Sequence, residues 1–255
     1  MAIARALTIL RAIAGAGAPG IRAGALASAT GLHRVTVHRV VAELASEGLV
    51  EQDEDRRYHL GAEALFLGQA AGRRFDLARV GEPEIERIER ETQDTVYLLR
   101  HVPGAVLCIA RRDGSYPIKS LVMDVGGRYP LGIGGGGLAV LAFLPEPEVE
   151  AALADVQGRL ARYPRVTMAK VRQLLRQTKK HGYAYWPGLI SEAHVVGVPI
   201  RAGSGEPVGA LSCAAIRERL QGARRERIVG LLKAGARAIE KQLSGRRPGK
   251  GSNGR

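Results

Sequence analysis

The stretch AGALASATGLHRVTVHRVVAEL, residues 23–44, decides how the first part of the chain folds. The spacing of its apolar residues predicts one helix over about residues 23–29 and a second over about residues 34–47. Ala27 is small where the two helices have to cross, and Gly31 can adopt the positive φ that the turn between them needs. This combination predicts a helix-turn-helix motif.

The predicted second helix has an apolar and a polar face. Val37 and Val40 would pack against Leu26 and Leu32 to form the core of the motif, although a generic pair of amphipathic helices would show a similar pattern. In a helix-turn-helix, the N-terminal residues of the second helix contact base edges in the DNA major groove. Polar or basic residues occupy this part of the helix, and they are the candidate DNA-binding residues: His33, Arg34, Thr36, His38 and Arg39.

The residues after this motif, LVEQDEDRRYHLG at 49–61, predict a small hairpin around an acidic turn. Arg56 and Arg57 follow the turn and are candidates for contacts with DNA phosphates or with the minor groove. The alternative is that these two arginines balance the charges of Asp53, Glu54 and Asp55 across the turn.

The remainder of the chain mixes helices and strands. Strands are expected at residues 95–102, 105–113, 117–125, 194–202 and 207–216. Helices are expected at residues 138–144, 147–155, 167–181 and 222–243. Because the strands fall in two groups with helices between and after them, the pattern predicts an α+β domain with an antiparallel sheet flanked by helices.

The sequence GIGGGG at residues 132–137 matches the pattern G-x-G-x-x-G through Gly132, Gly134 and Gly137. A dinucleotide-binding loop needs a parallel strand before this pattern and an acidic residue about 20 positions later, at the end of the next strand. Pro130 argues against the first requirement, and the sequence about 20 positions later is helical, so the match is interpreted as accidental. The glycines would instead expose N–H groups suited to a carboxylate at a helix start, or simply allow a tight loop and close helix packing.

Composition narrows the class of protein. The net charge is +13 over 255 residues, and most of the excess lies near the C-terminal end. A positive charge of this size is compatible with binding to nucleic acid or to membrane phosphate, or with a role in solubility alone. The apolar runs are too short for a transmembrane helix, and Arg11 interrupts the only stretch that resembles a signal peptide. Two cysteines form no disulfide framework, so we expect a cytoplasmic protein. The sequence has no metal-binding, phosphate-binding or nucleophile motif, which predicts no metal, no cofactor and no enzymatic activity.

Several stretches resemble the IclR-type transcriptional regulators. They are ATGLHRVTVHRVVAELASEGLV with YHLG, then GGRYPLGIGGGGLAVLAFLP, then HGYAY with VVGVPIRAGSGEPVGALSCAAI, so the resemblance covers residues from about 3 to 243. It implies a winged helix-turn-helix joined by linker helices to a GAF-like domain that binds a small effector, often an organic acid or an aromatic catabolite. It also implies a homodimer or homotetramer that binds a double-stranded DNA operator.

The resemblance extends to individual DNA-binding positions. The candidate residues at the start of the second helix match the segment that contacts DNA in the family, and the match adds Val35 to them. A small polar residue is usual at that position, so we expect a changed base preference. Leu138 replaces a lysine that commonly follows the family's glycine, so any role of that lysine is absent.

The resemblance also indicates an effector pocket. Ser212 lies on a strand that matches the pocket-lining strand of the family, where its hydroxyl would either orient an effector or bond to a neighbouring backbone group. Cys108 lies in an apolar strand, where cysteine usually behaves as a small hydrophobic residue, but it could still line a pocket. The remaining candidate effector-binding residues come from the glycine loop and the neighbouring strands: Ile133, Gly134, Gly135, Val195 and Ala214.

Tyr183, Tyr185 and Trp186 form a cluster in a chain with few aromatic residues. Core packing would explain this cluster. We expect core packing for at least one of the three, and the alternative is a lid or a stacking surface for an aromatic effector.

These observations predict a DNA-binding transcriptional regulator whose operator binding is modulated by a small-molecule effector. The expected parts are a winged helix-turn-helix at 1–61, linker and dimerisation helices at 62–91, an effector domain at 92–243 and a disordered basic tail at 244–255. Two other classes stay open. The glycine pattern suggests a dinucleotide-dependent oxidoreductase, and the charge suggests a non-specific basic nucleic-acid-binding protein.

Overall fold

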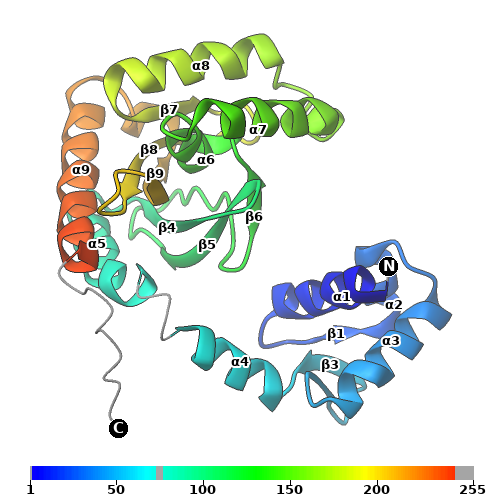
Figure 1. The fold of residues 1–255 in the computed structure, drawn as a ribbon. Coiled ribbons are helices and arrows are strands. Elements are labelled where there is room, and N and C mark those ends of the chain that lie inside the picture. Colours follow the sequence, from blue (N-terminus) through cyan, green and yellow to red (C-terminus); the bar gives the residue numbers. More distant parts are fainter. Residues whose placement is uncertain (1, 73–76, 245–255) are drawn as a thin grey trace, which may run out of the picture. The chain divides into compact units, whose positions relative to one another are not determined.

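The computed structural model describes residues 2–72 and 77–244, and the chain divides into two compact units, Met1–Asp76 and Leu77–Arg255 (Figure 1). The basic tail predicted at 244–255 lies outside the described residues, apart from Ser244. None of the helices in the described ranges is long and apolar enough to cross a membrane.

The first unit combines four helices with a small sheet in its described part. Three strands form an antiparallel sheet in the order β1-β3-β2. The elements in chain order are α1 (Ala2–Ala16), β1 (Ile21–Arg22), α2 (Ala23–Thr30), α3 (Arg34–Ser46), β2 (Val50–Gln52), β3 (Arg57–Leu60) and α4 (Ala62–Gly72). The predicted helix-turn-helix and the hairpin behind it are therefore confirmed, and we call the β2–β3 hairpin the wing.

The turn between α2 and α3 has the conformation that the sequence predicts. Gly31 caps α2 with a φ of 68°, in the left-handed region that glycine adopts without steric cost. Leu26, Val37 and Val40 are buried together in the core of this unit, and Leu32 packs against them. The apolar spacing of residues 23–44 therefore produces the packing that holds α3 against α2.

The second unit is built on one six-stranded antiparallel sheet in the order β6-β5-β4-β9-β8-β7. Its strands are β4 (Thr95–Val102), β5 (Ala105–Arg112), β6 (Arg128–Pro130), β7 (Ala184–Pro187), β8 (His194–Arg201) and β9 (Pro207–Ala215). Its helices are α5 (Leu77–Thr92), α6 (Gly134–Leu141), α7 (Glu146–Arg159), α8 (Met168–His181) and α9 (Gly222–Ser244), with short 3₁₀ turns at Leu160–Arg162 and Arg217–Arg219. The predicted α+β class with a flanked antiparallel sheet is confirmed.

Helices cover both faces of this sheet (Figure 1). Successive side chains of a strand point to opposite faces, so Tyr97 of β4 packs with α6, α7 and α8, whereas Leu98 packs with α5 and α9. On β9, Ser212 lies between Leu211 and Cys213, which both face the α5–α9 side. The alternation places the Ser212 side chain on the α6 face.

A buried cluster of ion pairs connects the N-terminal end of β4 with the start of α9. Asp94, at the start of β4, has a side chain only 2% exposed. Its carboxylate oxygens lie 2.6 Å from Arg219 Nε and 2.9 Å from Arg224 Nη2. Both arginines also donate to the carbonyl oxygen of Thr92, so the start of the sheet is fixed to the start of α9.

The strand predicted at 117–125 is wrong. These residues contain no regular secondary structure, and the edge strand that pairs with β5 is β6, which begins at Arg128. Their backbone groups bond to side chains in place of a strand partner, since the hydroxyl of Tyr97 donates to the carbonyl of Ser120 and accepts from the amide of Val122. We call residues 117–125 the covering segment, because part of it covers the cavity described below.

Two further differences concern the glycine run and the aromatic cluster. The helix expected at 138–144 begins earlier, at Gly134, because the glycines themselves form its first turn. Pro130 does lie in a strand, but β6 is a short antiparallel edge strand, so the dinucleotide-binding fold is excluded by topology and not by the proline. Tyr185 and Trp186 lie on the edge strand β7, which the sequence did not predict.

Candidate functional site

The start of α3 presents a polar surface. His33 precedes the helix as its N-cap residue with extended backbone, and Val37 is the first residue of the helix that is fully buried. Thr36 is half-buried. The other predicted DNA-binding residues of α3 are exposed: Arg34, Val35, His38 and Arg39. Val35 is 82% exposed, which is unusual for an apolar side chain in a helix. The arrangement leaves the first turn of α3 free to enter a DNA groove.

The two predicted arginines of the wing differ in their contacts. Arg56 lies at the turn with a φ of 58° and an exposed side chain. Arg57 Nη1 donates to the carbonyl of Pro19 at 3.4 Å. In the described residues no ion pair joins either arginine to the carboxylates at positions 53–55. Asp53 instead accepts a hydrogen bond from the Arg57 backbone amide and lies 2.8 Å from His59 Nε2. The charge-balance interpretation of the arginines has no contact to support it.

A cavity of about 120 Å³ lies between the N-terminus of α6 and the sheet, and we call it the α6 cavity. Its walls are largely apolar or aromatic, and none of the lining residues within the described ranges is charged. The lining includes Ile133 to Gly137 from α6 and its N-cap, Tyr97 and Leu99 from β4, Val106, Tyr129, Val195, Ser212, Trp186, Leu121 to Met123 of the covering segment, and Ile190, Ser191 and Ala193.

The glycines explain how α6 comes so close to the sheet. A Cβ atom on Gly135 would lie 2.8 Å from Val195 Cγ1, and one on Gly136 would collide with the side chain of Leu99. Only residues without a side chain allow this approach. The first four N–H groups of an α-helix have no partner inside the helix, and the N-terminal end carries partial positive charge. The helix start that lines the cavity is therefore suited to an oxygen acceptor on a ligand.

Two side-chain donors add to this helix end. Trp186 is 1% exposed, and its indole Nε1 is buried without a hydrogen-bond partner in the described part of the chain. Ser212 is 2% exposed and lines the cavity, and no backbone group of the described residues is seen bonded to its hydroxyl. Buried polar groups nearly always have a partner. Two residues with donor groups, Trp186 and Ser212, therefore line a largely apolar cavity, which suits a ligand that carries an acceptor on an apolar body.

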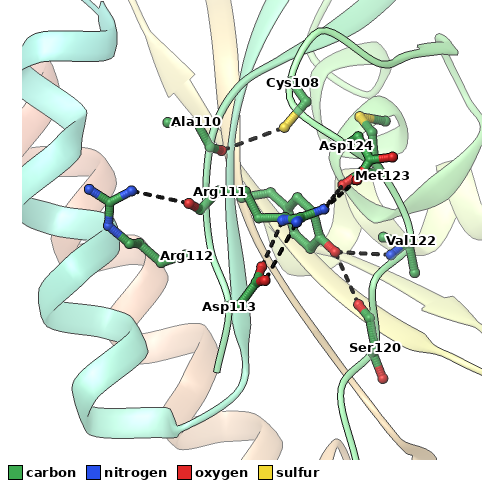
Figure 2. A network of polar contacts seen from close by, with 10 residues as sticks. Cys108, Ala110, Arg111, Arg112, Asp113, Ser120, Val122, Met123 and Asp124 are labelled. Atoms are coloured by element: carbon green, nitrogen blue, oxygen red, sulfur yellow. Dashed lines mark hydrogen bonds and ion pairs between the residues drawn. The ribbon is translucent and has the colours of Figure 1, made fainter. Parts of the chain in front are cut away.

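Side chains of β4 and β5 bond to the covering segment, and Figure 2 shows the contacts of Arg111 with Met123 and Asp124. Arg111 Nη1 lies 2.6 Å from Asp124 Oδ1 and donates to the carbonyl of Met123 at 3.1 Å, while its Nε lies 2.7 Å from Asp113. Burial raises the pKa of Tyr97, whose hydroxyl bonds to the same segment, to about 12. Tyr97 is therefore a neutral phenol that holds backbone at neutral pH.

Five of the seven predicted effector-binding residues line the α6 cavity: Ile133, Gly134, Gly135, Val195 and Ser212. Cys108 and Ala214 are buried in the core beside it but are not among its lining residues. Burial raises the pKa of the Cys108 thiol to about 11, so this sulfur is a protonated, apolar group.

Comparison with known proteins identifies the class of protein. The IclR helix-turn-helix domain matches residues 2–54, and the domain described as "Bacterial transcriptional regulator IclR C-terminal" matches residues 69–241. The chain belongs to the IclR family. It is a DNA-binding transcriptional regulator, and this family is not enzymatic, so the oxidoreductase alternative is excluded.

Individual relatives agree with this assignment. This IclR-family chain is 30% identical over 253 residues to the glycerol operon regulatory protein of Streptomyces coelicolor, covering 94% of each chain. A match at 29% identity to the regulator KipR of Bacillus subtilis spans 54% of this chain and 55% of that relative. The crystal structure of an IclR homolog complexed with 4-hydroxybenzoate from Microbacterium hydrocarbonoxydans has a TM-score of 0.75 and 26% identity, covering 95% of this chain and 99% of that one.

Several residues of the α6 cavity were not predicted from the sequence of this IclR-family chain. Tyr97, Leu99 and the covering segment come from parts of the chain without a functional motif. Trp186 was noticed only as a member of an aromatic cluster, and its neighbour Tyr185 does not line this cavity. The period of two along β7 separates these two aromatic residues, and it could have been recognised if the strand had been predicted.

Proposed function

We propose that this regulator binds its operator as a homodimer in the cytoplasm, and that a small effector in the α6 cavity changes its affinity for the operator. The observation that carries the proposal is the α6 cavity itself, a largely apolar space lined by the glycine-rich start of α6, by Trp186 and by Ser212. Such a combination of apolar walls and a few convergent polar groups is typical of ligand sites.

The effector would be a small aromatic or branched acid. The cavity of about 120 Å³ is close to the size of engineered cavities that bind a single benzene ring, which are about 150 Å³. Trp186 Nε1, the Ser212 hydroxyl and the N–H groups of α6 would bind the carboxylate or a phenolic oxygen. The complex of a relative with 4-hydroxybenzoate supports this class of ligand and makes that compound a suitable first probe.

The start of α3 would recognise the operator. Arg34, Thr36 and His38 would contact base edges, while Arg39 and the wing arginines would contact phosphates. His33, as the N-cap residue, would lie beside the backbone of the DNA. The exposed Val35 would contact an apolar group, and the only such group in the major groove is the 5-methyl of thymine.

Oligomerisation would use the first unit and the helices after it. Apolar side chains are exposed on α1, at Ile3 and Leu7, and on α4, at Leu65, Phe66 and Leu67. Exposed apolar side chains at consecutive positions of a helix, as on α4, are common in protein interfaces. We therefore propose that residues 62–91 connect the DNA-binding part, 1–61, to the effector domain, 92–243, and contribute to the dimer.

Binding assays with matched variants test the proposal. Operator DNA selected from a random pool is titrated with the protein by fluorescence anisotropy, with and without 4-hydroxybenzoate, and emission of the single tryptophan, Trp186, reports ligand binding. Gly135→Val should abolish the response to ligand and keep operator binding, because the side chain would enter the cavity wall beside Val195. Arg34→Ala should do the reverse, losing about 1–3 kcal/mol of base discrimination.

Two outcomes would contradict the proposal. Operator selectivity that survives Arg34→Ala would exclude α3 as the element that recognises sequence. A panel of aromatic and aliphatic acids that leaves both Trp186 emission and operator affinity unchanged would exclude the α6 cavity. Deletion of residues 245–255 distinguishes the remaining alternative, because a non-specific basic protein would lose all DNA binding with its tail.

A further inference from the structure

A second cavity, of about 170 Å³, lies beside the edge strand β7 and is lined by residues of α8, β7 and α9. It is formed by the last turns of α8, by the chain from Tyr183 to Tyr185 and by the start of α9, and we call it the α8–α9 cavity. Its lining is largely polar: Leu174, Gln177, Thr178, His181, Tyr183, Tyr185 and Arg225. This composition differs from the apolar α6 cavity and indicates a different ligand.

Arg225 carries the charge in the lining of this cavity, and no described residue is a counter-ion for it. Its guanidinium carbon lies 4.9 Å from the centre of the Tyr185 ring. Its Nε is buried and has no hydrogen-bond partner, and no carboxylate of the described residues pairs with it. The neighbouring Arg224 is different, because it is paired with Asp94. A guanidinium stacked on an aromatic ring, with terminal N–H groups that bond to no described residue, is suited to binding an oxyanion.

Two hydroxyl groups and a lysine near Arg225 have hydrogen-bond partners of their own. Thr178 donates to the carbonyl of Leu174, and the Tyr185 hydroxyl is 2.6 Å from His194 Nδ1. Among the described residues, no hydrogen bond joins Arg225 to either hydroxyl oxygen. Lys233 Nζ donates to the carbonyl of His181, where it offsets the negative end of α8. No carboxylate side chain is among the described lining residues. The balance of charge around the α8–α9 cavity is therefore positive.

We propose that the α8–α9 cavity binds a small oxyanion, a carboxylate or a phosphate, through Arg225. The inference extends to regulation, and that part rests on the proposed effector function. Tyr185, under the guanidinium, and Trp186, in the wall of the α6 cavity, are consecutive residues of β7 that point to opposite faces. An oxyanion that fixes Arg225 and Tyr185 also fixes the strand that carries Trp186, so its binding changes the affinity of the α6 cavity for the effector.

NMR of the arginine side chains tests the site directly. The full-length protein is titrated with inorganic phosphate and, separately, with sodium acetate, at constant ionic strength set by sodium chloride so that general screening does not change. We expect the Nε–Hε signal of Arg225 to shift in a saturable way with at least one of them, with a Kd of about 1 mM. The anion that binds more tightly identifies the chemistry of the natural ligand.

Variants on the same helix provide the control. Arg225→Gln should weaken binding at least about tenfold, whereas Arg227→Gln, which removes an exposed charge two residues away, should leave it unchanged. The proposal is overturned if the Arg225 signal does not saturate with either anion, or if both variants weaken binding equally. Folding of the variants does not decide the result, because the wild-type titration alone can contradict the site.

The regulatory part has its own measurement. The Kd of 4-hydroxybenzoate, from Trp186 emission, is compared with and without saturating oxyanion in the wild type and in Arg225→Gln. A change in the wild type only supports the coupling, and no change refutes the coupling while the site itself stands. Gly135→Val distinguishes the two cavities, because it should abolish the effector signal and leave the Arg225 shift intact.

Discussion

Replacing Tyr97 with phenylalanine removes the hydroxyl that holds the covering segment. That oxygen donates to the carbonyl of Ser120 at 3.0 Å and accepts from the amide of Val122 at 2.9 Å. Each intramolecular hydrogen bond contributes about 1 kcal/mol net, and a buried partner left without a bond costs about 1–3 kcal/mol. Because Val122 is only half-buried, water can reach its amide, so we expect a total loss of about 2 kcal/mol in the free energy of unfolding.

The loss can be measured in two ways. A change of about 2 kcal/mol lowers the melting temperature of a unit of this size by about 4–8 °C, and emission of Trp186 follows unfolding of this unit specifically. Hydrogen exchange of the Val122 amide should become faster, because the group that accepts its bond is gone. Binding of an effector should weaken as well, since Leu121 and Met123 line the α6 cavity.

Tyr129→Phe is the matched control. Its hydroxyl makes one hydrogen bond, to the carbonyl of Val122 at 2.8 Å, so its removal should cost about 1 kcal/mol. If Tyr97→Phe costs no more than Tyr129→Phe, or if exchange at Val122 keeps its wild-type rate, then the Tyr97 hydroxyl does not hold the covering segment and the reasoning is wrong.

Three further predictions concern other parts of the chain. Asp94→Asn should lower the free energy of unfolding by about 3 kcal/mol in urea denaturation, because it leaves two arginines facing a neutral group; a loss below about 1 kcal/mol would refute the role of the ion pair. Replacing the thymine contacted by Val35 with deoxyuracil should weaken operator binding by about 0.8 kcal/mol, the value of one buried methylene, and Val35→Ala should remove that difference. The hydrogen bond from the Arg57 amide, and then the one from His59, lowers the pKa of Asp53 below its ordinary value of 3.8. The ionised Asp53 carboxylate should therefore stabilise the wing fully above pH 3.8, and this stabilisation should be lost only as the pH falls below that value. An NMR titration of Asp53 with a midpoint at or above 3.8 would contradict this prediction.

The sequence by itself determined the helix-turn-helix and the class of the second unit. Residues 23–44 contain local information only: a helical period of apolar residues, a small residue at the crossing and a glycine at the turn. These features act within a few residues of one another, so the observed φ of Gly31 and the buried face of α3 follow from them directly. The same holds for the long strands β4, β5, β8 and β9, whose apolar runs are bounded by turn residues.

Residues 117–125 show where local information was insufficient. Their apolar pattern is compatible with a strand, but a strand needs a partner, and β6 occupies the edge of β5. Their backbone is bonded to the side chains of Tyr97 and Arg111 instead. Such contacts join residues far apart in the sequence, and only the completed sheet brings them together.

The glycine run combines both kinds of information. Its sequence predicts a flexible backbone at the start of an apolar helix, whereas the antiparallel topology of β6 excludes a dinucleotide-binding fold. The tertiary structure alone shows that Gly135 and Gly136 let α6 contact the sheet at Val195 and Leu99, and that Trp186 joins the same cavity from an edge strand. The physical reason is that a helix start and its apolar period are set by neighbouring residues, whereas a cavity is set by which distant segments pack against one another.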